Sequence, residues 1–131
     1  MARSLRFVAS PLDRLPRSHC RARVILERPG HDLYIGTAEG ASAHLNELWC
    51  AAEAAAMALR QAVAPTDPEA VQVRGVERFE LFGKATVLVA VAARRDHEAR
   101  PLIGVGQIDG DAGRAAAVAV LNATNRFLEV G

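Results

Sequence analysis

Histidine and cysteine are the first residues to consider for chemistry, because both bind metals and both can act as bases or nucleophiles. No two of the four histidines have a metal-ligand spacing, and the two cysteines lie far apart in the chain. We therefore expect no metal site, no cofactor and two buried, reduced structural thiols. The residues concerned are His19, His31, His44, His97, Cys20 and Cys50.

A nucleophile beside a base is the next possibility. His44 and Cys50 are six residues apart in a helical pattern, which places them on opposite sides of the helix. Glu47 and Glu53 share that helix and have the pattern of solvent-facing charges. No serine has the context of a nucleophile elbow. The sequence thus predicts a protein that is not an enzyme, with an unfamiliar catalytic site as the less favoured alternative.

Glycines near the predicted strand ends give a stronger signal. Gly104 and Gly106 end a strand that leads through Asp109 and Asp111 into a helix. A strand, a glycine turn and a helix N-terminus can hold a carboxylate on backbone N–H groups. The same spacing also fits a tight connection in which an aspartate caps the helix. It matches neither a dinucleotide fingerprint nor a P-loop.

A similar entry precedes the first predicted helix, where Gly40 follows a strand and Ser42 has the composition of an N-cap. We expect any small ligand to lie where residues 40–42 and 104–111 approach one another. The candidate ligand-binding residues are Gly40, Ser42, Gly104, Gly106, Asp109 and Asp111.

Alternating apolar residues predict the strands of the first half. Residues 19–27 alternate with Val24 and Leu26 on one face, and residues 33–39 alternate through Leu33, Ile35 and Thr37. A turn at residues 29–32 joins them into a hairpin.

The first helix is predicted from Ser42 to about Ala64, where Pro65 ends it. In the second half, residues 71–82 form a strand with a bulge at Gly75, and the valine-rich residues 85–93 form its neighbour. A charged loop at 94–100, a short strand at 101–106 and a helix from Asp109 or Asp111 to about Phe127 follow.

The order is therefore ββα and then βββα, an α+β fold in which one antiparallel sheet is covered on one face by two helices. The uncovered face would be a natural interface if it is apolar. The length of 131 residues fits one domain, which we assign to residues 19–131. A flexible arginine-rich arm at residues 1–18, with one short strand expected at residues 5–8, precedes it.

Charge is uneven along the chain. Residues 1–28 hold seven arginines and two carboxylates, a net +5, while the remainder carries −4, for +1 overall. The apolar runs are too short to span a membrane, and no secretion signal is evident, so we expect a cytoplasmic protein. Nucleic-acid binding by the arm is less favoured, because few aromatic residues are free to stack on bases.

The stretch GVGQIDGDAGRAAAVAVLNATNR, residues 104–126, resembles the end of the regulatory domain of the 2-isopropylmalate synthase family, which includes citramalate synthase. The matching positions are Asp111, Ala115, Ala119, Ala123, Asn125 and Arg126. The chain departs from that family after Gly40, where Ala41-Ser42-Ala43 replaces a Gly-Pro-Val type segment, and it lacks the catalytic barrel.

This resemblance implies the same ββα/βββα layout, a homodimer, and a small-molecule effector such as an amino acid near the dimer interface. The favoured function is thus a non-catalytic dimeric domain that binds a small molecule or a protein partner. The alternative is an assembly module that uses its sheet face and basic arm.

Overall fold

The computed structural model describes residues 5–30 and 32–128, and for His44 the backbone alone. Its first half consists of β1 (Arg6–Ala9), β2 (Leu12–Leu15), β3 (His19–Glu27), β4 (Leu33–Ala41) and α1 (His44–Val63). β4 pairs antiparallel with one side of β3, and β1 and β2 follow each other along the other side. The first sheet is therefore three strands wide.

The second half consists of β5 (Val71–Leu81), β6 (Lys84–Arg95), β7 (Glu98–Gln107) and α2 (Ala112–Leu128). Its strands form an antiparallel sheet in the order β5-β6-β7. Both halves thus end in a helix that packs on the strand just before it, α1 on β4 and α2 on β7.

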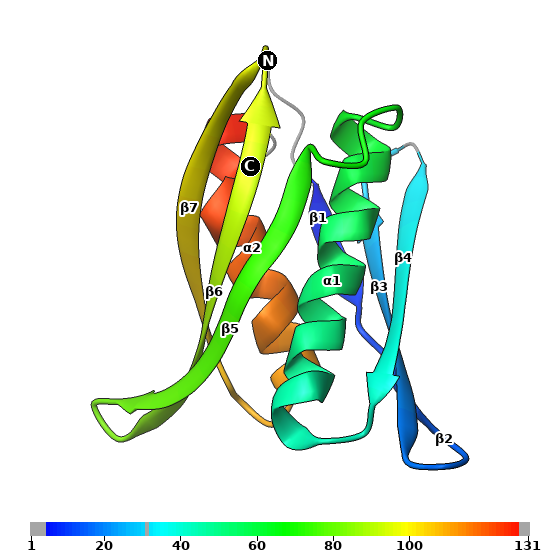
Figure 1. The fold of residues 1–131 in the computed structure, drawn as a ribbon, viewed down its shortest axis with the longest axis vertical. Helices are drawn as coiled ribbons and strands as arrows, with labels where there is room; N and C mark the ends of the chain where they lie inside the picture. The colour runs from blue at the N-terminus through cyan, green and yellow to red at the C-terminus, as the bar shows by residue number, and fades with distance from the viewer. Residues whose placement is uncertain (1–4, 31, 129–131) are drawn as a thin grey trace.

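The α+β class and the predicted order of strands and helices are confirmed, but the strands form two sheets where we expected one. The two helices pack against each other and lie between the sheets (Figure 1). The helices lie between the sheets because α1 is buried on several sides. Its buried side chains include Leu48, Ala52, Ala55 and Leu59. A helix that covered one sheet from outside would expose about half of its surface.

The segment predicted as a flexible arm is instead built into the first sheet from Arg6 onward. Phe7 pairs with Leu26 and Leu12 pairs with Ala22, so both point toward the core. Strand β2 escaped prediction because four residues between Pro11 and Pro16 are too few to show a period. Residues 1–4 lie outside the described part of the chain.

In β4 the side that faces the core differs from the expected one. Tyr34 and Gly36 pair with the buried Leu26 and Val24, so Leu33 and Ile35 face outward. Successive side chains of a strand point to opposite faces, so a shift by one residue exchanges the two faces. The apolar residues of β4 fall on both faces, and the pattern therefore does not decide between them.

Turns and irregularities explain the remaining differences. The predicted bulge at Gly75 is confirmed by a register shift between Val73 and Gly75. The charged loop expected at 94–100 is a tight hairpin, in which Asp96 and His97 adopt positive φ angles of 52° and 68°. Such turns are normally recognised by Asn-Gly or Asp-Gly, which this sequence lacks here. In the turn at residues 29–32, Gly30 has a φ of 75°, and His31 lies outside the described residues.

Candidate functional site

The glycines predicted to bind a ligand lie against the helices. A Cβ on Gly104 would overlap the carbonyl oxygen of Ala119 and lie 2.6 Å from the Ala123 nitrogen. One on Gly106 would overlap the carbonyl oxygen of Ala115. Only glycine allows the α2 backbone to approach β7 this closely. Gly104 and Gly106 therefore lie at the packing seam between β7 and α2.

The first half has the same arrangement. A Cβ on Gly36 would overlap the carbonyl oxygen of Ala54 and lie 2.7 Å from the Ala58 nitrogen. A Cβ on Gly40 would lie 2.9 Å from the Sγ of Cys50. Gly36 lies inside the predicted strand at residues 33–39, and a glycine in such a place indicates that another backbone comes close.

The polar candidates have separate roles. Asp111 caps α2, since its Oδ1 accepts a hydrogen bond from the Arg114 N–H at 3.0 Å. Asp109 lines a hollow of about 340 Å³ at the start of α2, and Asp111 and Arg114 line the same hollow. Ser42 does not cap α1, whose N-cap is Ala43 without a side-chain hydrogen bond. Its hydroxyl instead donates to Glu47 at 2.9 Å.

A pocket of about 250 Å³ lies where the starts of the two helices meet the link between β1 and β2. We call it the helix-start pocket; its polar lining is Ser10, Arg14, Glu47 and Asp111, with Leu48 and Gly113 among the rest. Of the six predicted site residues, Asp111 alone lines it.

The charges of the helix-start pocket are largely matched. Arg14 donates twice to Glu47 at 3.3 Å, and the Glu47 carboxylate also accepts from Ser42. Glu47 is therefore half-buried and paired, whereas the sequence suggested a solvent-facing charge. The Ser10 Oγ is buried beside the start of α2 without a hydrogen-bond partner. An unsatisfied hydroxyl is costly, so it marks a place where a polar group could be accommodated.

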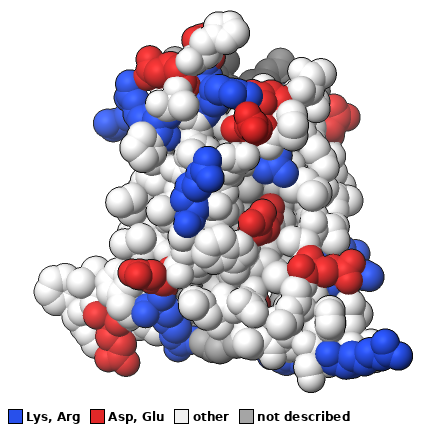
Figure 2. Space-filling view, in the orientation of Figure 1, with Lys and Arg blue, Asp and Glu red and all other residues white. Residues whose placement is uncertain are grey.

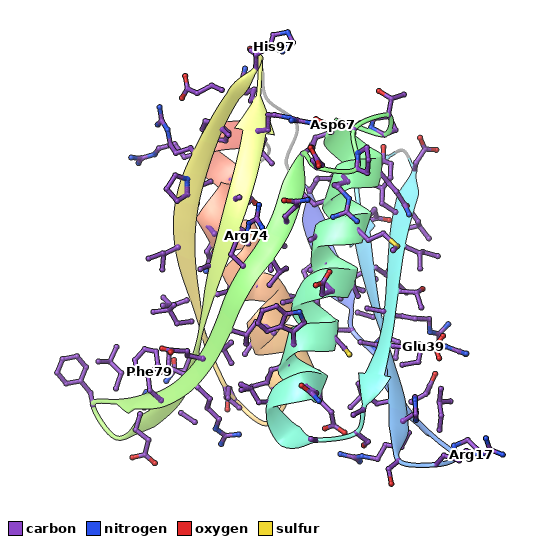
Figure 3. All side chains as sticks on the ribbon, viewed as in Figure 1. Arg17, Glu39, Asp67, Arg74, Phe79 and His97 are labelled. Atoms are coloured by element: carbon purple, nitrogen blue, oxygen red, sulfur yellow. The ribbon has the colours of Figure 1, made fainter. Side chains whose placement is uncertain are left out.

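A wider hollow of about 640 Å³ lies at the opposite end of the molecule, lined in part by Asp67, Arg94 and His97. Asp67 and His97 come from the loop before β5 and from the β6–β7 hairpin (Figure 3). Arg94 donates to both oxygens of Asp67, at 3.1 and 2.7 Å. This ion pair lowers the pKa of Asp67 and raises that of Arg94. Asp67 therefore remains ionised at neutral pH and is poorly suited to donate or accept a proton there.

The predicted burial of both cysteines is confirmed. Burial first, and then the neighbouring Cys20 thiol, raise the pKa of Cys50 from 9.0 to about 11. A catalytic thiol needs the opposite shift. Among residues 5–30 and 32–128 no cluster of histidine, cysteine and carboxylate residues could hold a metal ion.

The outer face of the second sheet exposes apolar side chains of β7. The inward residues Val87, Val89 and Val91 are buried, so their neighbours in the strand point away from the helices. Ile103 and Val105 of β7 are 67% and 46% exposed. Apolar and small residues continue this surface onto β6 and part of β5, where the exposed Glu77 is the direct partner of Leu88. We call it the β5–β7 outer face, formed by Gly75, Phe79, Leu88, Ala90, Ala92, Pro101, Ile103 and Val105.

The outer face of the first sheet is different. Arg6 pairs with Glu27, and ion pairs also join Arg21 to Glu39 and Arg23 to Asp13. Glu39 projects from β4 away from the helices (Figure 3). The apolar Ile25 and Ile35 lie opposite each other among these charges.

Charged side chains also distribute unevenly over the side of the molecule where α1 and β5 face the viewer. They gather toward its two ends, and the middle is mostly uncharged (Figure 2). No helix in the described residues combines the length and the apolar character needed to cross a membrane.

Comparisons with known proteins identify no relative of this chain. No family model, no curated protein and no solved structure matches the chain.

Proposed function

We propose that the chain is a non-catalytic module that assembles into a homodimer through the β5–β7 outer face. The observation that carries this proposal is the exposure of Ile103 and Val105, of which Val105 pairs with Leu88, on a face of the second sheet that neither α1 nor α2 covers. Contiguous exposed apolar surface is unusual on a protein that acts alone.

The size of the face fits a second copy of the chain. Strands about ten residues long and about 4.8 Å apart cover roughly 500 Å² on three strands. Two copies packed face to face would bury about 1,000 Å², the lower limit for a specific interface. Two flat sheet faces pack well at about 10 Å separation, and a two-fold axis lets one face serve both copies.

The charge distribution favours a second copy of the chain over an acidic partner. Glu77 of the edge strand β5 brings one charge to this face beside Leu88, whereas the β6 and β7 part of the face offers little to a charged ligand. The arginines of the first half would be the natural contact for nucleic acid, yet Arg6, Arg21 and Arg23 are in ion pairs. Resemblance to a regulatory domain that dimerises adds support.

Sedimentation velocity of wild type and two variants tests the proposal. Val105 and Ile35 are both 46% exposed and lie on corresponding strands of the two sheets. We expect the wild type to be a dimer at roughly 100 µM, Val105→Glu to be a monomer, and Ile35→Glu to remain a dimer. A monomeric wild type, or equal loss of dimer in both variants, would refute the proposed interface.

The helix-start pocket supports a second candidate function, the binding of a small zwitterion such as an amino acid. Arg14 and the N-terminal end of α2 suit a carboxylate, while Glu47 and Asp111 suit an ammonium group. The buried Ser10 hydroxyl is the specific observation in its favour.

Isothermal calorimetry with leucine, isoleucine and their 2-keto acids tests this second function. We expect heat from at least one ligand, lost in Arg14→Ala and retained in Arg21→Ala, because Arg21 pairs with Glu39 and does not line the pocket. If none of these compounds gives heat or a shift in melting temperature, small-molecule binding of this class is ruled out.

A further inference from the structure

The two cysteines come from different elements and meet in the core of the first half. Cys20 lies on the inward side of β3 and is fully buried, and Cys50 lies on α1 with 5% exposure. Each is therefore held by a backbone that the fold has already fixed.

A glycine provides the space in which the thiols meet. Gly40 of β4 is the direct partner of Cys20 in β3, so its missing side chain would project to the same face. The sulfur of Cys50 lies 2.9 Å from the point that a Cβ on Gly40 would occupy. A larger residue at position 40 would force the Cys50 sulfur out of this position.

The pKa of Cys50 also depends on its neighbours. The Cys20 thiol, through its hydrogen bond and its proximity, helps to raise the pKa of Cys50, after burial. Glu47 and Glu53 of α1 act in the same direction. The Cys20 thiol also donates a weak hydrogen bond to the carbonyl oxygen of Ala41, at an Sγ–O distance of 3.7 Å.

We propose that Cys20 and Cys50 form an intrachain disulfide when the protein meets a peroxide. The thiolate of one cysteine attacks the peroxide, forming a sulfenic acid and releasing water, and the second thiol then attacks that sulfur and releases a second water. Overall, two thiols and one hydrogen peroxide give one disulfide and two water molecules. The sulfurs are oxidised and the peroxide oxygens are reduced.

The bond would form slowly and then persist. Both thiols are buried and protonated, so attack requires transient separation of α1 from β3. Once closed, the disulfide would be shielded from reductants, which reach exposed bonds more easily. It would connect α1 to β3 beside Leu48 and Ala51, which line the helix-start pocket.

The experiment treats the full-length protein with hydrogen peroxide and maps its peptides without reduction. We expect a Cys20–Cys50 cross-linked peptide, a mass lower by two hydrogen atoms, and a melting temperature higher by roughly 10 °C. Cys20→Ala and Cys50→Ala should show no such rise. The replacement alanine is small and apolar, so both variants should fold.

Two outcomes would overturn the proposal. One is the presence of two free thiols after peroxide treatment and unfolding. The other is separate oxidation of each cysteine, without a cross-link. Should either variant fail to fold, peptide mapping of the wild type still decides between these results. A Gly40→Ala variant sharpens the test, because displacement of Cys50 should slow cross-linking relative to Gly75→Ala, whose Cβ would meet only the Ala90 side chain at 3.8 Å.

Discussion

The two halves of this molecule share one internal device and differ on their outer surfaces. In each half, glycines of the last strand let the following helix approach closely, Gly36 and Gly40 for α1, Gly104 and Gly106 for α2. The outer faces diverge, with ion pairs on the first sheet and mainly apolar side chains on the second. The shared part therefore serves the fold, and the part that differs is where function is to be sought.

Substitution in the glycine seams should produce the largest effect. Gly36→Ala and Gly104→Ala each place a methyl group on a helix carbonyl oxygen, and we expect a loss of about 3 kcal/mol in the free energy of unfolding for each. Urea titration measures both. Gly75→Ala is the matched control and should change stability by less than about 0.5 kcal/mol, because its Cβ would make only an ordinary contact with Ala90 at 3.8 Å. A small effect at Gly36 and Gly104 would show that the helices can shift without cost.

Alkaline pH should affect the first half through Cys50. Its pKa is raised from 9.0 to about 11, so the folded protein holds this proton more tightly than the unfolded chain does. The stabilisation is complete below pH 9 and is lost as the pH rises toward 11, by about 2 kcal/mol. Urea unfolding in reducing buffer on both sides of this window, compared with Cys50→Ala, isolates the contribution. A wild type and variant with the same pH dependence would contradict it.

Helix capping also differs between the halves, and changes to it should alter the free energy of unfolding less than the changes above. Asp111 caps α2, whereas Ala43 at the start of α1 provides no side-chain acceptor. We expect Asp111→Ala to lower the free energy of unfolding by about 1 kcal/mol and Ala43→Ser to raise it by a few tenths. Thermal denaturation followed by circular dichroism measures both. An unchanged stability in Asp111→Ala would mean that the hydrogen bond from Arg114 contributes nothing as a cap.

The ion pairs on the outer face of the first sheet should contribute least. Arg21 and Glu39 lie 3.6 Å apart with both side chains well exposed. We expect a double-mutant cycle with Arg21→Ala and Glu39→Ala to give a coupling of less than about 0.5 kcal/mol, which vanishes in high salt. A coupling well above this value would assign the charged face a structural role equal to that of the seams.

Local sequence patterns predicted much of the fold because they report local physics. Strand β3 has the predicted bounds, and the bulge at Gly75 and the cap at Asp111 follow from residue chemistry. The separation into two sheets was not predictable in this way, because it depends on which sides of α1 find partners. That choice is made by long-range packing.

The candidate site was harder to predict because glycine has two uses. At Gly104 and Gly106 the same absence of a side chain that could admit a ligand admits a helix. The sequence contains no signal that separates these uses. The residues around the helix-start pocket, Ser10 and Arg14, come from the segment that we had expected to be flexible. Strand pairing with β3 brings that segment to the pocket.

The order of the seams along the chain has a kinetic consequence. Each helix follows directly on the strand it packs against, so Gly36 meets Ala54 and Gly104 meets Ala119 across short stretches of chain. Contacts this local close quickly, because the entropy cost of looping the chain is small. We expect each half to gain amide protection early in pulsed hydrogen exchange, with docking of α1 against α2 as the slower step that joins them.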